Sequence, residues 1–167
     1  MLENRLSTFD SPRREDARKW ALRPPSGAEI IDTGAARWWA EGPRTVCNQS
    51  YTTKVTPDNL RAGFQACGDL SEDLPIVLIA ESGPLAETTR EARLLLAGSE
   101  AAAVYGAMAV VVSSPVAAVI MRFFVRFARP PFTVQVFSSA EAARGWAAEE
   151  VDRMLTRERV AQELAEE

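Results

Sequence analysis

The chain has 167 residues, of which 47% are hydrophobic and 25% are charged. This composition is typical of a single globular domain with a hydrophobic core, and it differs from that of a disordered chain. Its 19 Lys and Arg against 23 Asp and Glu give a net charge of −4 at pH 7, so no overall basic field favours nucleic acid as a partner. The chain has no histidine, which removes the commonest general base and nearly every zinc or haem site. We therefore expect no enzyme, no metal and no cofactor.

The first 34 residues form an arm rich in Arg, Pro, Ser and Gly. Ser11 as N-cap and Pro12 at the first helical position predict one short helix within it. Trp20 and Leu22 are the side chains that could attach the arm to the body. The arm holds no apolar run of the length of a secretory signal, so we expect a cytoplasmic protein.

From Ala35 onward the sequence alternates between strand and helix patterns. β-Branched and aromatic segments predict strands, and hydroxyl caps followed by Pro or by an apolar helical period predict helices. In chain order we expect two hairpin strands in 35–55, a helix from Thr56 to Gly68, a buried strand at 74–82, a helix from Thr88 or Thr89 to 106, a strand at 107–113, a helix at 115–128, a strand at 132–138 and a last helix from Ser139.

Two pairs of residues bear on the core. Trp38 and Trp39 are adjacent on a predicted strand, so their rings point to opposite faces and cannot enter the same core. We expect one ring to be covered by the N-terminal arm or by a second subunit, or the strand to lie in a sheet covered on both faces. Cys47 and Cys67 have no CxxC spacing, so we interpret both as small core residues.

Residues 101–121 hold no charge over a length that could cross a bilayer. Ser113, Ser114 and Pro115 interrupt the stretch, and Val110 to Val112 is typical of a buried parallel strand. We therefore predict no transmembrane span.

Two strands followed by alternating helices and strands predict an α/β fold, in which right-handed crossovers place the helices against the sheet. We divide the chain into an N-terminal arm at 1–34, an α/β domain at 35–155 and a helical or frayed tail at 156–167. The tail is helix-prone but nearly empty of large apolar side chains.

Several segments from about Ala35 to Val151 resemble bacterial proteins of the STAS-like (SpoIIAA-like) fold, a family named for sulphate transporters and anti-sigma-factor antagonists. The resemblance implies a mixed sheet of about five strands with four helices, and an adaptor or switch without enzymatic activity. The segments that carry it are Thr56-Pro57-Asp58-Asn59-Leu60, Thr89-Arg90-Glu91-Ala92-Arg93, Ser113-Ser114-Pro115-Val116 through Phe123-Phe124, Arg129-Pro130-Pro131-Phe132, Val136-Phe137-Ser138 and Ala142 to Trp146.

The chain departs from this family at one motif. The antagonists resemble each other by an Asp-Ser-Ser-Gly type turn before the second helix, whose serine a partner kinase phosphorylates. The corresponding stretch here runs from Glu81 to Thr89 without that motif. Thr88 and Thr89 are the candidate phosphorylation sites in its place, since a helix N-terminus accommodates a phosphate. Simple capping explains both threonines as well.

The helix predicted at 115–128 carries a basic stripe. Arg122, Arg126 and Arg129 recur at i, i+4 and i+7, interleaved with three phenylalanines. Such a helix could meet an acidic protein, an anionic lipid surface or a phosphate-bearing ligand, and Ser113 and Ser114 could form the rim of a small anion site. The alternative is an ordinary amphipathic helix with its phenylalanines on the sheet, its arginines in water and its serines as caps.

We expect a non-enzymatic protein-interaction or regulatory module of STAS-like type, with a protein partner of open identity and with homodimerisation as an option. No phosphate loop, dinucleotide motif or nucleophile elbow occurs in the sequence. The alternative function is a small-ligand or lipid-binding domain that uses Arg122, Arg126 and Arg129 and an apolar crevice near Ser114.

Overall fold

The computed structural model describes residues 20–83 and 86–166, and this part of the chain holds eight strands and five helices. The short helix predicted at Ser11 and Pro12 lies outside the described residues. The elements are, in chain order, β1 (Ile31–Asp32), β2 (Ala36–Gly42), β3 (Thr45–Ser50), β4 (Lys54–Val55), α2 (Pro57–Ser71), β5 (Ile76–Ser82), β6 (Glu87–Thr88), α3 (Arg90–Leu96), α4 (Ser99–Val104), β7 (Tyr105–Val111), α5 (Pro115–Ala128), β8 (Thr133–Phe137) and α6 (Ala140–Ala165).

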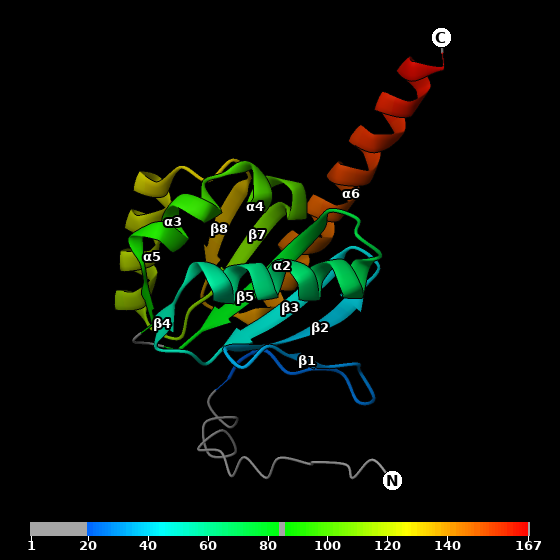
Figure 1. Cartoon of the computed structure of the whole chain (residues 1–167). Coiled ribbons are helices and arrows are strands. Elements are labelled where there is room, and N and C mark those ends of the chain that lie inside the picture. The colour runs from blue at the N-terminus through cyan, green and yellow to red at the C-terminus, as the bar shows by residue number, and fades with distance from the viewer. Residues whose placement is uncertain (1–19, 84–85, 167) are drawn as a thin grey trace, which may run out of the picture.

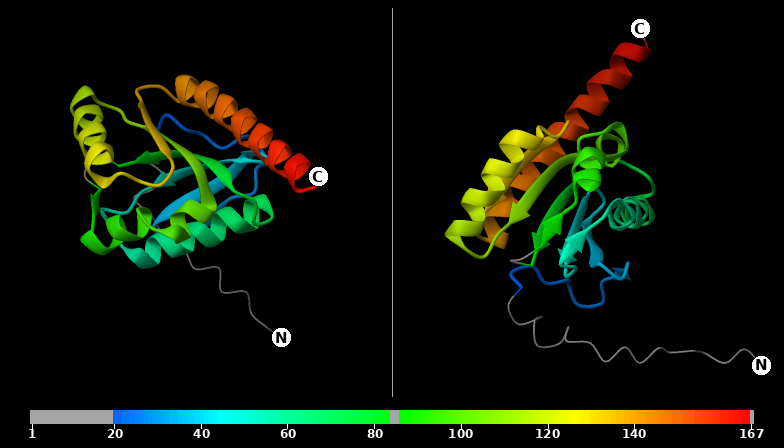
Figure 2. Two further views of the ribbon diagram at one scale, coloured as in Figure 1. Left: turned by 90° about the horizontal axis from the view of Figure 1, so that it is seen from above. Right: turned by 60° about the vertical axis from the view of Figure 1, so that its left-hand side comes forward.

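Six strands form one mixed sheet in the order β1-β2-β3-β5-β7-β8 (Figure 1). The pairs β1/β2 and β2/β3 are antiparallel, whereas the remaining neighbours are parallel. The parallel strands follow one another in chain order, so right-handed crossovers place all their helices on one face. Helices α2, α3 and α4 lie in front of the sheet in Figure 1 and α6 lies behind it, as Figure 2 also shows. The α/β class is therefore confirmed.

The sheet separates two apolar cores. Trp39, Cys47 and Ile79 pack on the side of α6, and Trp38 and Cys67 pack on the side of α2. The two tryptophans therefore do point to opposite faces, as predicted. Both cysteines are buried free thiols, which confirms their assignment to the core. Burial raises the pKa of the Cys67 thiol to about 12.

The N-terminal segment covers Trp39, as one of our interpretations expected. Leu22 is fully buried in the same cluster as Trp39. Its backbone N–H and that of Ala21 each donate to the buried carboxylate of Glu81 at 2.8 Å, and Gln49 Nε2 donates to the Leu22 carbonyl at 2.5 Å. The chain from Leu22 onward is thus tied to the sheet before the predicted start of the domain.

The prediction of about five strands and four helices was too low, because the described part of the chain has six strands in its main sheet and five helices. The sixth strand is β1, where Ile31 pairs with Trp38. The extra helix arises because Gly98 takes an extended conformation and caps α4, which divides one predicted helix into α3 and α4. Strands β4 and β6 also pair with each other in a separate two-stranded ladder.

Three helix ends also differ from the prediction. The helix predicted to run to 106 ends at Val104, because Tyr105 already pairs with Ile76 in β7. Helix α2 continues past Gly68 to Ser71, because Glu72 rather than the glycine takes the left-handed conformation that ends it. Helix α6 runs unbroken for 26 residues and its C-terminal part projects from the body (Figure 1). Glu158 anchors the base of this projection through an ion pair of 2.6 Å with the buried Arg44. Within the described ranges, no helix is both long and apolar enough to span a bilayer.

Candidate functional site

Helix α5 begins and ends at the residues that the sequence indicates. The Ser114 hydroxyl accepts a hydrogen bond of 3.1 Å from the Ala117 N–H, and Pro115 occupies the first turn. At the other end Arg129 takes the left-handed conformation with φ 43°, and its N–H donates to the Val125 carbonyl at 3.2 Å. The serine therefore acts as a cap, which was one of the two interpretations open for it. Ser113, beside it, is exposed.

The inner face of α5 packs against β7 and β8. Ala118 is buried there, in contact with a cluster that contains Val110 and Val112. Phe124 lies at the side of this face and lines a groove toward α3. The interpretation that all three phenylalanines pack on the sheet is wrong, because Phe123 and Phe127 lie on the opposite side and are exposed. Residues 123 and 127 are one turn apart, whereas residue 124 is rotated from 123 by about 100°.

The outer face of α5 carries a row of five large apolar side chains, which we call the α5 stripe. Each is between 64% and 70% exposed, and the rings of Phe123 and Phe127 have centroids 4.4 Å apart. At 3.6 residues per turn the five positions fall within about 100° of arc. A contiguous exposed apolar surface of this kind marks an interaction site in soluble proteins. The members of the α5 stripe are Val116, Val119, Ile120, Phe123 and Phe127.

The predicted arginine stripe lies beside this apolar row. Arg122, Arg126 and Arg129 are all exposed, and the first two are next to Val119 and Phe123 around the helix. No carboxylate in the described part of the chain forms an ion pair with any of the three. The structure therefore brings together three unpaired cations and five exposed apolar side chains on one helix.

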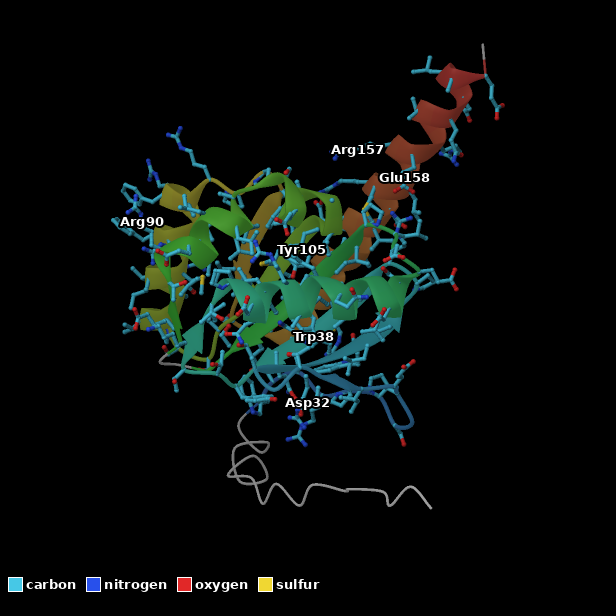
Figure 3. The ribbon with its side chains drawn as sticks, in the orientation of Figure 1. Asp32, Trp38, Arg90, Tyr105, Arg157 and Glu158 are labelled. Atoms are coloured by element: carbon cyan, nitrogen blue, oxygen red, sulfur yellow. The ribbon has the colours of Figure 1, made fainter. Side chains whose placement is uncertain are left out.

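A groove of about 340 Å³ extends this surface toward α3. Arg90, Arg93 and Leu94 line it from α3, and Phe124 and Phe127 line it from α5. The Leu94 side chain is 63% exposed. Figure 3 labels Arg90 at this end of the molecule. The groove is lined by apolar side chains and by two arginines, so α3 and α5 form one continuous candidate interface.

The two candidate phosphorylation sites lie near this groove and have structural roles. The Thr89 hydroxyl caps α3 by accepting from the Ala92 N–H at 3.1 Å. Thr88 belongs to β6, where it pairs with Val55, and its carbonyl accepts a hydrogen bond of 2.6 Å from Arg93. Both threonines are half-buried. Phosphorylation of either one stays a prediction.

The sequence contains the helical period of the α5 stripe, but it does not show that this face of the helix is the exposed one. Positions 116, 119, 120, 123 and 127 show a helical period, and so do Ala118, Met121 and Val125 on the other side. A helix that is apolar nearly all round gives no preference for which face meets the sheet. Arg90, Arg93 and Leu94 were missed because only the tertiary packing of α3 beside α5 makes them part of the surface.

Comparison with known proteins gives one match. The model of a family described as a domain of unknown function, DUF7793, matches residues 50–150. The matched range is more than half of the chain, and it includes α3, α5 and the groove between them. No curated protein and no solved structure matches the chain.

Proposed function

This chain belongs to the DUF7793 family, and we propose that it is a non-enzymatic interaction module that binds an acidic amphipathic segment of another protein. The binding surface is the outer face of α5 with the groove between α5 and α3. The single observation that carries the proposal is the α5 stripe, in which five large apolar side chains are each 64–70% exposed.

Exposed apolar area supplies the driving force for association. Fully burying one large apolar side chain contributes roughly 1.5–3 kcal/mol, so a partner that covers most of the α5 stripe gains several kcal/mol before the cost of ordering is subtracted. The stripe is rimmed by Arg122 and Arg126, and protein interfaces commonly have such an apolar centre with a polar rim in which arginine is enriched.

Charge complementarity indicates the kind of partner. Arg122, Arg126 and Arg129 border the α5 stripe, while Arg90 and Arg93 line the groove. This end of the molecule is basic although the whole chain has a net charge of −4. Acidic side chains on the partner would be attracted to this end and would fix the orientation of docking. The geometry of two helices with a groove between them suits an amphipathic helix that lays its apolar face on them.

We further propose that the domain is STAS-like (SpoIIAA-like), cytoplasmic and regulatory. The mixed sheet with parallel β3, β5, β7 and β8 and a helix in each crossover supports this assignment. The Asp-Ser-Ser-Gly type turn, whose serine a partner kinase phosphorylates in the antagonists, is absent here, and Thr89 caps α3 instead. We therefore centre the recognition surface on α5.

Photo-crosslinking tests the proposal most directly. The photoreactive residue p-benzoylphenylalanine is placed at Phe123 in the full chain and, as a matched control, at Leu164, which is 69% exposed on α6. Position 123 should crosslink to an acidic, apolar segment of one other protein, and position 164 should not. Crosslinks only to lipid, only to a second copy of the chain, or with the same products at both positions would contradict the proposal. Crosslinks only to lipid would favour the lipid-binding alternative, and crosslinks only to a second copy would favour a homodimer. The same products at both positions would show that the surface has no specific partner.

The crosslinked segment then serves as a synthetic peptide for affinity measurements. Phe123→Ser should weaken its binding at least about tenfold, as loss of a central aromatic contact does in other interfaces. Leu164→Ser removes an equally exposed side chain outside the surface and should leave the affinity unchanged. Equal affinities of both variants would show that the α5 stripe is not the binding surface.

A further inference from the structure

We propose that a cavity between the sheet and helices α2, α3 and α5 is a binding site for a small, neutral, mainly apolar molecule that carries a hydroxyl or amide group. This site is distinct from the outer face of α5, and the inference does not depend on the proposed interaction with a protein. It rests on two unpaired buried polar atoms whose residues line the same cavity.

The cavity lies over one row of side chains across the sheet. Strand register places Trp38 beside Asn48, Asn48 beside Ala80 and Ala80 beside Val110, and all four line a cavity of about 170 Å³. A cavity of about 150 Å³ lined by apolar side chains is known to hold benzene, so this one is large enough for a ligand of that size. Leu60, Leu96 and Phe124 complete the walls from α2, α3 and α5.

Trp38 and Asn48 each present a polar atom without a partner. The indole Nε1 of Trp38 and the amide Oδ1 of Asn48 are inaccessible to solvent and form no hydrogen bond within the described part of the chain. The two residues are only 5% and 8% exposed. Leaving a buried donor or acceptor unpaired is costly and uncommon in native proteins, so a pair of them at one site calls for a missing partner.

The chemistry of the two atoms defines the partner. The indole nitrogen can only donate and the amide oxygen only accepts, and the two residues are direct cross-strand neighbours on β2 and β3. A hydroxyl group can accept from the first and donate to the second, and an amide can do the same with its two ends. A carboxylate would bring a charge into an apolar space beside an acceptor, which is unfavourable. The cavity walls made by Leu60, Leu78 and Met108 suit an aromatic ring or short alkyl chain attached to that group.

The position of Trp38 is set by its contact with α2. A Cβ atom placed on Gly63 would lie 2.5 Å from Cζ2 of Trp38, so the helix backbone holds the indole closely. Figure 3 labels Trp38 and Tyr105 on either side of α2, and Tyr105 also lines the cavity. The donor is therefore held in place before a ligand binds, which favours recognition.

The test compares two probes of nearly equal shape, benzyl alcohol and ethylbenzene, which differ by a hydroxyl in place of a methyl group. Each is titrated into the full chain while the methyl resonances of Leu60, Met108 and Val110 are followed by NMR. Benzyl alcohol should shift these resonances in a saturable manner, whether or not ethylbenzene also does. Absence of saturable shifts with both probes would overturn the proposal and would leave a bridging water as the partner of the two atoms.

The ratio of the dissociation constants of benzyl alcohol and ethylbenzene then tests whether the unpaired atoms of Trp38 and Asn48, which we call the polar pair, bind the hydroxyl group. Because the cost of desolvating the hydroxyl is the same in every variant, it cancels when the ratio is compared between proteins. Asn48→Leu should reduce the preference for benzyl alcohol over ethylbenzene by about 3- to 10-fold, the value of one hydrogen bond. Gln135→Leu makes the same kind of change at an exposed position of β8 and should leave the ratio unchanged. A ratio that is the same in wild type and Asn48→Leu would overturn the role of the polar pair.

Folding of the variants gives an independent readout. Asn48→Leu removes an unpaired polar atom and keeps the side-chain volume, so it should unfold at a temperature no lower than wild type. Trp38→Phe removes the other unpaired atom but also part of a buried ring system, so it should fold and unfold at a somewhat lower temperature. Trp38→Phe should change the ratio of dissociation constants in the same direction as Asn48→Leu. Loss of folding in both variants would show that the two atoms are structural, and it would overturn the proposal.

Discussion

At the scale of residues, the two adjacent tryptophans show how position on a strand decides the environment of a side chain. The Trp39 indole Nε1 donates to Glu41 at 3.3 Å, whereas Nε1 of Trp38 has no partner in the described part of the chain. Both rings are buried, on opposite faces of β2. Within the described residues Glu41 accepts from the Trp39 indole and no group accepts from the Trp38 indole, which is the basis of the ligand site that we propose.

Gly63 is the residue whose replacement tests the packing of Trp38. Alanine normally stabilises a helix interior by about 1 kcal/mol relative to glycine. At Gly63 the new Cβ would lie 2.5 Å from Trp38, so Gly63→Ala should instead lower the free energy of unfolding by about 1–3 kcal/mol. Gly145→Ala on α6, where nothing lies within 4 Å of the new atom, should raise it. Urea denaturation measures both, and a stabilising Gly63→Ala would show that the indole is free to move.

Glu41 predicts a dependence of stability on pH. Two hydrogen bonds of 2.8 Å from Arg144 reach its carboxylate and hold its pKa below the ordinary 4.5. A lowered folded-state pKa contributes stability that is present above the unfolded pKa and is lost as pH falls through the folded pKa. Glu41→Gln should therefore cost about 1 kcal/mol at pH 7, because the partly exposed guanidinium is screened by water.

The same substitution should matter less in acid. As pH falls through the lowered pKa of Glu41, the wild-type carboxylate becomes protonated, so the unfolding curves of wild type and Glu41→Gln should approach each other. Glu163→Gln, which changes an exposed carboxylate on α6, should lie within about 0.5 kcal/mol of wild type at both pH values. A difference between Glu41→Gln and wild type that is independent of pH would show that the ion pair with Arg144 contributes little.

At the scale of elements, local signals in the sequence predict most of the fold. Thr56, Thr89, Ser114 and Ser139 all cap the helices that they were predicted to begin, because capping depends on residues three positions apart. The apolar run of β5 likewise marks a strand covered on both faces. What could not be predicted depends on contacts between distant elements, such as which face of α5 meets the sheet.

The candidate sites follow the same division. The arginines of α5 are visible in the sequence because they share one helix. The cavity is not, because it depends on the register that sets Trp38 beside Asn48 across β2 and β3. The groove between α3 and α5 is also hidden in the sequence, since these helices are joined through β7 and meet only in the folded chain.

The arginines of α5 give a prediction for this helix as an element. Arg122, Arg126 and Arg129 are exposed and without ion pairs to carboxylates in the described ranges. Replacing all three with Gln should change the free energy of unfolding by less than about 1 kcal/mol. Binding of the partner peptide should weaken strongly, and binding to wild type should weaken as salt is raised. A folded triple variant with unchanged affinity would exclude the arginines from the site, and an unfolded one would show that an arginine has a structural role.

At the scale of the whole molecule, α5 links the two proposed sites. Its outer face carries the α5 stripe and its inner face provides Phe124 to the cavity. The opposite face of the sheet is closed by α6 and by the N-terminal segment, whereas the α3–α5 end carries exposed apolar and basic side chains next to each other. The surface that we propose for recognition therefore lies on the helices of one face of the sheet, and α6 closes the other face.

Glu81 holds the N-terminal segment on the face of the sheet that α6 covers. Its buried carboxylate accepts from the backbone N–H groups of Ala21 and Leu22 at 2.8 Å each, and hydrogen bonds to a charged group contribute about 1.5–3 kcal/mol. In Glu81→Gln one acceptor oxygen becomes an NH₂ donor that faces an N–H group, so the N-terminal segment should detach more often. Hydrogen exchange of the Leu22 amide should accelerate at least about tenfold, and the free energy of unfolding should fall by about 1–3 kcal/mol. Glu87→Gln, at an exposed position in β6, serves as the control. If Leu22 exchanges at the same rate in both variants, burial of its side chain beside Trp39, and not the carboxylate of Glu81, holds the segment on the sheet.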